Sequence, residues 1–96
     1  MKNIISKLNK AFESRIRLGI MSILSVNDSA DFNTMKQLME LTDGNLASHL
    51  KSLEGLGYIQ SFKQFIGRKP NTSYMLTEDG RKCFKEHLDA LEELIK

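Results

Sequence analysis

Two side chains in this sequence have a spacing that suits metal binding. Cys83 and His87 are four residues apart, so a helix would place both on one face, where each could ligate a metal ion. Two ligands make half of a tetrahedral site, and a second copy of the chain would have to complete it. We prefer the alternative that His87 packs at an interface between subunits, and we therefore expect no metal and no other cofactor.

Catalytic chemistry has no support in the residue pattern. The sequence contains no recognisable nucleophile and base arrangement, no glycine-rich phosphate loop and no metal-binding motif. Helix capping or solvation explains the acidic residues Asp43, Glu54, Glu78 and Asp79. We therefore expect a protein that is not an enzyme.

Polar groups suited to binding gather on one predicted helix, residues 43–56. Its leucines form a buried stripe, while the opposite side is small, polar and uncharged or positive. That side and the first turn carry Asp43, Gly44, Asn45, Ser48, Lys51 and Ser52. Such a surface suits close approach to a partner with hydrogen-bonding groups. His49 lies at the border of the buried stripe, and either a phosphate contact or a packed, partly buried histidine would explain it.

Basic residues mark a second candidate surface. Arg68 and Lys69 stand in a turn-like segment, residues 67–71, and Lys63 precedes it. At the tip of a hairpin, these cations could contact the phosphates of a nucleic acid or enter one of its grooves. The alternative is a solvated charged surface without a partner.

The periodicity and the punctuation of the chain predict the elements that position these residues. In chain order we expect a helix over residues 4–25 with a break near Ser14, a very short strand at 31–32, and helices over 34–41 and 43–56. A strand over 58–66 with an allowed bulge, a loop over 67–71, a strand over 72–76 and a helix over 78–95 follow. The expected N-caps are Asn33, Thr42 and Thr77, and Gly57 is expected to stop the third helix.

This order indicates a winged helix-turn-helix, because two short helices with a capped turn between them precede a hairpin with a basic tip. The expected fold class is α+β, mainly α, with a two-stranded β-hairpin wing and long terminal helices. Residues 33–56 would form the helix-turn-helix, 58–76 the wing and 78–95 the C-terminal helix. A helix with small polar residues facing outward can enter the major groove of DNA.

Length and charge set limits on this interpretation. A chain of 96 residues is one domain, residues 1–96. The net charge of +2 is unevenly distributed: residues 1–42 carry six basic and four acidic groups, 43–77 four and two, and 78–96 four and six. We therefore expect the positive body to face DNA and the negative last helix to face a partner subunit.

Cellular location follows from what the sequence lacks. A single cysteine excludes a disulfide within the chain, and no apolar run approaches the roughly 18 residues of a membrane span. Residues 1–7 lack the long apolar stretch and the cleavage site of a secretory signal. We expect a cytoplasmic protein with no membrane partner.

Residues 41–59 and 68–81 together resemble the recognition helix, wing and start of the final helix in the MarR and ArsR winged-helix regulators. The similarity is strongest to small, stand-alone members of about one hundred residues. It implies a homodimeric transcriptional regulator that binds double-stranded DNA, with repression the commoner outcome. The positions matching Asp43, Gly44, Asn45, Ser48 and Ser52 would lie toward bases or nearby phosphates, and those matching Lys63, Arg68 and Lys69 would belong to the wing.

The chain departs from this family at Ser48, where many relatives have arginine or glutamine. Serine reaches less far and discriminates poorly between bases, which weakens direct readout. Lys51 and His49 are further candidates for DNA contact.

A dimer interface is predicted on the first and last helices, because the apolar stripe of the last helix continues to the end of the chain. The candidate residues are Leu18, Met21, Phe84, His87, Leu88, Leu91, Leu94 and Ile95. Two alternative functions remain: a winged-helix protein–protein interaction module that does not bind DNA, and a sensor of a metal or of a small molecule, whose identity is unknown, held at the dimer interface.

Overall fold

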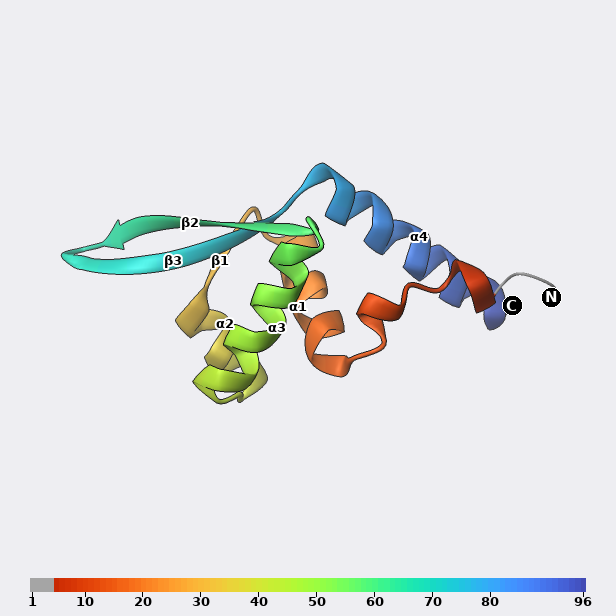
Figure 1. Cartoon of the computed structure of the whole chain (residues 1–96), viewed down its shortest axis with the longest axis horizontal. Coiled ribbons are helices and arrows are strands. Elements are labelled where there is room, and N and C mark those ends of the chain that lie inside the picture. Colours follow the sequence, from red (N-terminus) through yellow and green to blue (C-terminus); the bar gives the residue numbers. More distant parts are fainter. Residues whose placement is uncertain (1–4) are drawn as a thin grey trace.

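A computed structural model describes residues 5–96 of the chain. Its elements are two 3-10 turns, η1 (Ile5–Lys7) and η2 (Lys10–Phe12), four helices, α1 (Arg15–Val26), α2 (Phe32–Met39), α3 (Asp43–Gly55) and α4 (Glu78–Leu94), and three strands, β1 (Ala30–Asp31), β2 (Ile59–Ile66) and β3 (Lys69–Leu76). The fold is the expected mainly helical winged helix (Figure 1).

The first predicted helix is interrupted at Ser14, where the sequence indicated a break. Ser14 is the N-cap of α1, and its hydroxyl accepts a hydrogen bond from the backbone N–H of Arg17. The chain before Ser14 forms only the two 3-10 turns, so the first helix is shorter than expected. Ile4, where that helix was predicted to begin, lies outside the described residues.

The helix-turn-helix differs from prediction at its first helix. Asp31, and not Asn33, caps α2, because the Asp31 carboxylate accepts from the backbone N–H of Thr34 at 3.2 Å. Glu40 ends α2 in the left-handed conformation, with φ of 53°. The cap of α3 is the predicted Thr42, whose hydroxyl accepts from the backbone N–H of Asn45.

The sheet is antiparallel with strand order β1-β3-β2, so the hairpin gains a third strand at its base. The β2–β3 register is continuous from Ile59 opposite Leu76 to Ile66 opposite Lys69, and the bulge that the sequence allowed is absent. The loop is also shorter than predicted. Only Gly67 and Arg68 connect the strands, and Gly67, with φ of 67°, makes this tight turn possible.

Pro70 lies within β3 although proline usually breaks a sheet. The strand β1 pairs with β3 only at Ser73 and Tyr74. Within the described part of the chain, no third strand pairs with β3 beyond these residues, so a missing N–H is tolerated there.

The core lies around α1, which packs against η2, α2, α3 and β3. Its fully buried side chains come from α1, α2, α3 and β2, and include Ile20, Met21, Leu24, Met35, Leu46, Leu50, Leu53 and Ile59. The start of α4 packs against the base of the hairpin, where Gly80 lies directly over the backbone of Tyr58.

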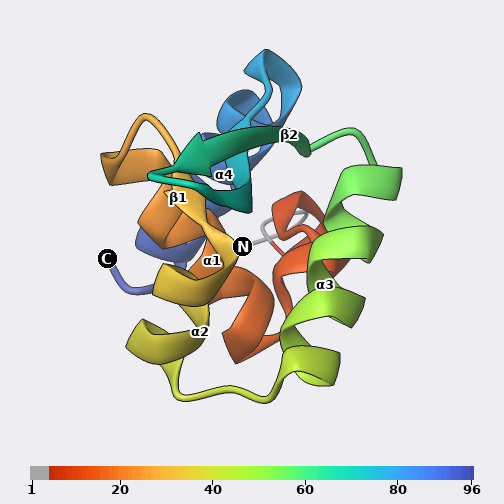
Figure 2. The same ribbon diagram turned by 90° about the vertical axis from the view of Figure 1, so that its left-hand side faces the viewer.

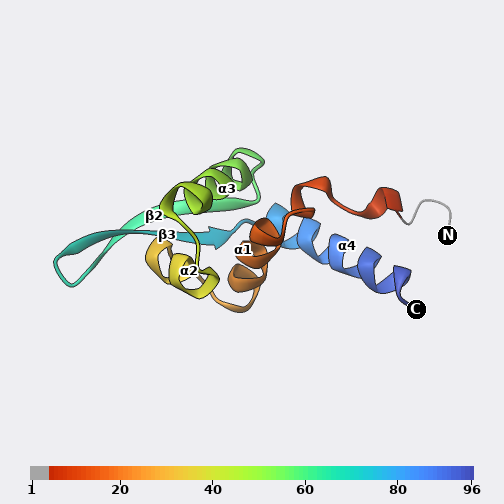
Figure 3. The same cartoon turned by 90° about the horizontal axis from the view of Figure 1, so that it is seen from below.

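The molecule is elongated, with extents of 53 × 25 × 22 Å. The hairpin projects at one end, on the side of α2 and α3, while α4 extends toward the other end (Figure 1). Figure 2, viewed from the hairpin end, shows the two strands above α2 and α3. The view from below in Figure 3 shows α4 pointing away from this end.

Candidate nucleic-acid interface

The exposed face of α3 is bare, meaning that its side chains are small, polar and uncharged or positive, as the sequence indicated. Gly44, Asn45, Ser48 and Lys51 are exposed, and Ser52 is half-buried. The buried leucines Leu46, Leu50 and Leu53 hold the opposite face against the core. Because its outward side chains are short, the helix could approach the floor of a groove closely.

Asp43 is not a free anion at the start of α3. Its carboxylate oxygen Oδ1 lies 2.7 Å from Nζ of Lys36 in α2. This pair neutralises the acidic residue that would otherwise oppose phosphates. No local pattern in the sequence marks Lys36 as this partner.

His49 is half-buried and anchored, which favours the packed histidine over the phosphate contact. Nε of Arg17 in α1 donates a hydrogen bond to Nδ1 of His49 at 3.0 Å. The acceptor role of Nδ1 leaves the proton on Nε2 in the neutral ring. Arg17 could not be predicted as the partner from local sequence patterns, because the two residues are 32 positions apart.

The hairpin, which we call the wing, carries the second group of candidates. Lys63, Arg68 and Lys69 are exposed, and within residues 5–96 none of them forms an ion pair. Between Glu54 and Glu78 the sequence has no acidic residue. The wing is therefore a purely positive projection.

Polar contacts hold the wing at a fixed angle to the helices. The hydroxyl of Ser61 donates to Oε2 of Glu54 in α3 at 2.6 Å. On the other edge, Nδ2 of Asn71 donates to Oδ2 of Asp31 at 3.3 Å. Hydrogen bonds from Thr34 lower the pKa of the Asp31 carboxyl, so it stays an acceptor at neutral pH.

The wing tip also exposes two large apolar residues that were not among the predicted site residues. Phe65 is 74% exposed and Ile66 is 55% exposed. They precede the turn directly, and α3 and the wing tip lie at the same end of the molecule (Figure 1).

The predicted dimer residues divide into two groups. Met21, Phe84 and His87 are buried inside the protomer, so their assignment to a surface is wrong. The residues that remain available are the exposed Leu88, Leu91 and Ile95, together with the partly exposed Leu18 and Leu94. The stripe that faces the core is Gly80, Phe84, His87 and Ala90, because Gly80 lets α4 approach the hairpin.

His87 belongs to the protomer core. Its Nδ1 accepts a hydrogen bond from the backbone N–H of Asn9 at 3.0 Å, and its ring packs edge-on against Phe12. Burial lowers the pKa of His87 and raises the pKa of the Cys83 thiol. Within residues 5–96, no three histidine, cysteine or acidic side chains lie close enough together to hold a metal ion.

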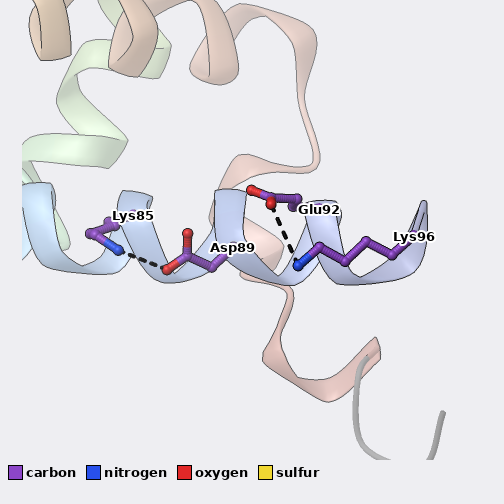
Figure 4. Close-up of polar contacts among 4 residues, drawn as sticks. All are labelled: Lys85, Asp89, Glu92 and Lys96. Carbon is purple, nitrogen blue, oxygen red and sulfur yellow. Dashed lines mark hydrogen bonds and ion pairs between the residues drawn. The ribbon is translucent and has the colours of Figure 1, made fainter.

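The outer side of α4 neutralises much of its own charge. Lys85 lies 2.9 Å from Asp89, and Lys96 lies 3.7 Å from Glu92, along one side of the helix (Figure 4). Lys7 in η1 lies 3.6 Å from Glu93. Three of the six acidic residues in 78–96, namely Asp89, Glu92 and Glu93, are therefore ion-paired. No helix within the described part of the chain is long and apolar enough to cross a membrane.

Comparison with known proteins agrees with this geometry. The family model of a winged helix DNA-binding domain matches residues 16–95, a range that includes α3 and the wing. An uncharacterized protein of Methanocaldococcus jannaschii is 36% identical over 87 residues, 91% of this chain and 95% of that protein.

Two solved structures share the fold over nearly the whole chain. The transcriptional regulator homologue protein from Pyrococcus horikoshii OT3 is 30% identical with a TM-score of 0.88, over 99% of this chain and 95% of that one. The structure of reduced AbfR bound to DNA is 18% identical with a TM-score of 0.75, over 94% of this chain and 64% of that one. The second similarity concerns the fold alone.

Proposed function

This chain belongs to the family of winged helix DNA-binding domains, and from that membership we propose that it is a cytoplasmic repressor that binds specific sites on double-stranded DNA as a homodimer. The observation that carries the proposal is the position of an unpaired positive wing beside a bare helix face at one end of the molecule. The name of the Pyrococcus horikoshii structure, a transcriptional regulator homologue, supports the regulatory part.

In the proposed complex, α3 lies in the major groove. Gly44 and Asn45 in its first turn and Ser48 one turn later are the residues nearest to base edges. Lys51 and Ser52 contact the adjoining phosphates. The ion pair between Lys36 and Asp43 removes the charge that would repel the backbone, since the carboxylate is already neutralised. His49 contributes indirectly, because its bond with Arg17 orients α3 on α1.

The wing contacts the neighbouring backbone through Lys63, Arg68 and Lys69. A fold relative, AbfR, has been solved with DNA bound, which supports a duplex as the partner of this fold. With three wing cations and Lys51 per protomer, a dimer neutralises about 6–10 phosphates, and its affinity falls accordingly as salt is added.

The homodimer is proposed from the exposed apolar residues of α4. Leu88 and Ile95 lie between the buried stripe and the ion-paired side of the helix, and Leu91 lies on the face of the stripe, one turn beyond His87, where it is exposed. A second copy would cover them by an isologous contact, and the paired charges of α4 would not oppose it. Two copies of α3 would then reach successive major grooves, about 34 Å apart.

The test is the salt dependence of DNA binding, measured by fluorescence anisotropy with a random-sequence duplex. The variant Arg68→Ala/Lys69→Ala removes up to four phosphate contacts per dimer. Since each contact contributes about 0.9 to the slope of log K against log salt, we expect the slope to fall in magnitude by about 3–4.

The matched control removes the same charge outside the proposed interface. Lys10→Ala/Lys82→Ala should leave the slope of the wild-type protein unchanged. A wing variant with the wild-type slope would show that the wing does not contact phosphates. A wild-type protein that binds no duplex at low salt and micromolar concentration would contradict the function and favour a protein–protein interaction module.

A further inference from the structure

The wing tip exposes apolar surface that the protomer does not use. Phe65 and Ile66 are 74% and 55% exposed, although a phenylalanine gains about 1.5–3 kcal/mol from full burial. Neither side chain belongs to the core or packs against it. Adjacent residues of a strand point to opposite faces, so the two side chains cover both sides of the tip.

The same tip is positively charged on both faces. Phe65 pairs with Pro70, and Lys63 lies two residues away on the face of Phe65. Ile66 pairs with Lys69 on the other face, and Arg68 occupies the turn itself. The tip is therefore a narrow hairpin end with apolar side chains at its centre and cations around them.

This arrangement matches the minor groove of a duplex. The sugar-phosphate backbones form the walls of that groove, and its floor consists of base edges. Proteins that bend DNA from the minor groove insert apolar side chains between base steps and hold the walls with cations. The absence of any acidic residue from 55 to 77 favours a polyanion over a protein surface of mixed charge.

We propose that Phe65 is a wedge that enters the minor groove and partly unstacks one base step on each side of the operator, with Ile66 against the adjoining sugar. This proposal rests on the DNA binding proposed above and adds a source of specificity to it. Flexible pyrimidine–purine steps such as TA open more easily than stiff A-tracts. The wing would therefore favour operators whose flanking DNA costs less energy to deform. The short side chains of Asn45 and Ser48 leave room for such a contribution, since they discriminate weakly between bases.

The experiment uses the full chain and two 30-base-pair duplexes built on a core sequence selected by the wild-type protein from random DNA. The duplexes differ only at the flanks, which carry either TA steps or A-tracts, and 2-aminopurine replaces one flanking adenine in each. The readouts are the affinity, the 2-aminopurine fluorescence and the end-to-end distance by energy transfer.

For the wild-type protein we expect about tenfold tighter binding to the TA duplex, a rise in fluorescence and a shorter end-to-end distance. Phe65→Ala should lose all three effects while its affinity for the A-tract duplex stays within about twofold. Phe65→Leu should retain part of each. The control Val26→Ala, at a residue that is 81% exposed on α1, should behave as the wild type does.

Three outcomes would overturn the inference. If Phe65→Ala keeps the preference for TA and the fluorescence rise, the wedge is wrong while DNA binding stands. If Phe65→Ala leaves both unchanged but abolishes binding to vesicles of phosphatidylglycerol, the tip serves an anionic membrane. If the wild-type protein binds no duplex, the proposed function fails first and the wedge with it.

Discussion

Among the glycines, Gly80 is the position at which an added methyl group should lower the free energy of unfolding most. A Cβ added at this residue would lie 1.9 Å from the carbonyl oxygen of Tyr58, and 2.7 and 2.9 Å from its carbonyl carbon and Cα. All three are backbone atoms at the base of the wing. They cannot turn away as a flexible side chain would, so Gly80→Ala must displace α4 from the hairpin.

The size of the effect follows from these contacts. A carbon–oxygen contact relaxes at about 3.3 Å, so the two backbones must separate by about 1.4 Å. Overpacking of this kind costs about 1–3 kcal/mol. The Tyr58 carbonyl also accepts from the backbone N–H of Thr77 at 3.1 Å, and weakening that bond adds about 0.5–1.5 kcal/mol.

Alanine partly compensates, because it is a better helix former than glycine by about 1 kcal/mol. We therefore expect Gly80→Ala to lose about 0.5–3.5 kcal/mol of unfolding free energy, or roughly 2–28 °C in Tm for a domain of this size.

The assay is urea unfolding followed by far-UV circular dichroism, at several protein concentrations because a dimer would make stability concentration-dependent. Gly44→Ala is the matched control, since it is also a helical glycine and no atom lies within 4 Å of its added Cβ. It should be neutral or up to about 1 kcal/mol more stable. A Gly80→Ala protein within about 0.5 kcal/mol of the wild type would refute the packing of α4 against the wing base.

Two other perturbations test the protomer core and the dimer. Because burial holds the pKa of His87 below its ordinary value of 6.5, stability should be complete above pH 6.5 and fall as the pH drops below it, when the unfolded chain takes up the proton first. His87→Gln keeps an acceptor for the N–H of Asn9 but does not titrate, so its unfolding free energy should change less between pH 7.5 and 5; an unchanged pH dependence would contradict this. Leu88→Lys places like charges across the proposed two-fold axis and should weaken dimerisation by more than about tenfold in sedimentation equilibrium. Leu38→Lys, on α2, should not, and equal dissociation constants for the two variants would exclude α4 as the interface.

The local signals in the sequence predicted most of the elements. Thr42 and Thr77 marked the starts of α3 and α4, because a threonine side chain before a periodic segment satisfies an N–H of the first turn. Ser14 was correctly identified as the place where the first segment breaks. These features depend on neighbours within four residues, which a sequence displays directly.

The errors arose where several residues compete for the same role. Asp31 and Asn33 can both cap α2, and Asp31 takes this position because β1 holds it beside Asn71 on the wing. Similarly, Gly67 to Asn71 all favour a loop, but pairing with β2 extends β3 to Lys69. In each case a residue distant in sequence decided between local alternatives of similar energy.

The sequence by itself therefore determined the winged-helix order, the bare face of α3 and the positive character of the wing, because composition, caps and periodicity are local properties. Only the tertiary structure decided which apolar residues are free to bind. In α4 the Gly80 contact with Tyr58 turns Phe84 and His87 toward the core and leaves Leu88 exposed. At the wing tip no element within residues 5–96 covers Phe65. Burial depends on what the rest of the chain places beside a residue, and the helical or strand period alone does not contain that information.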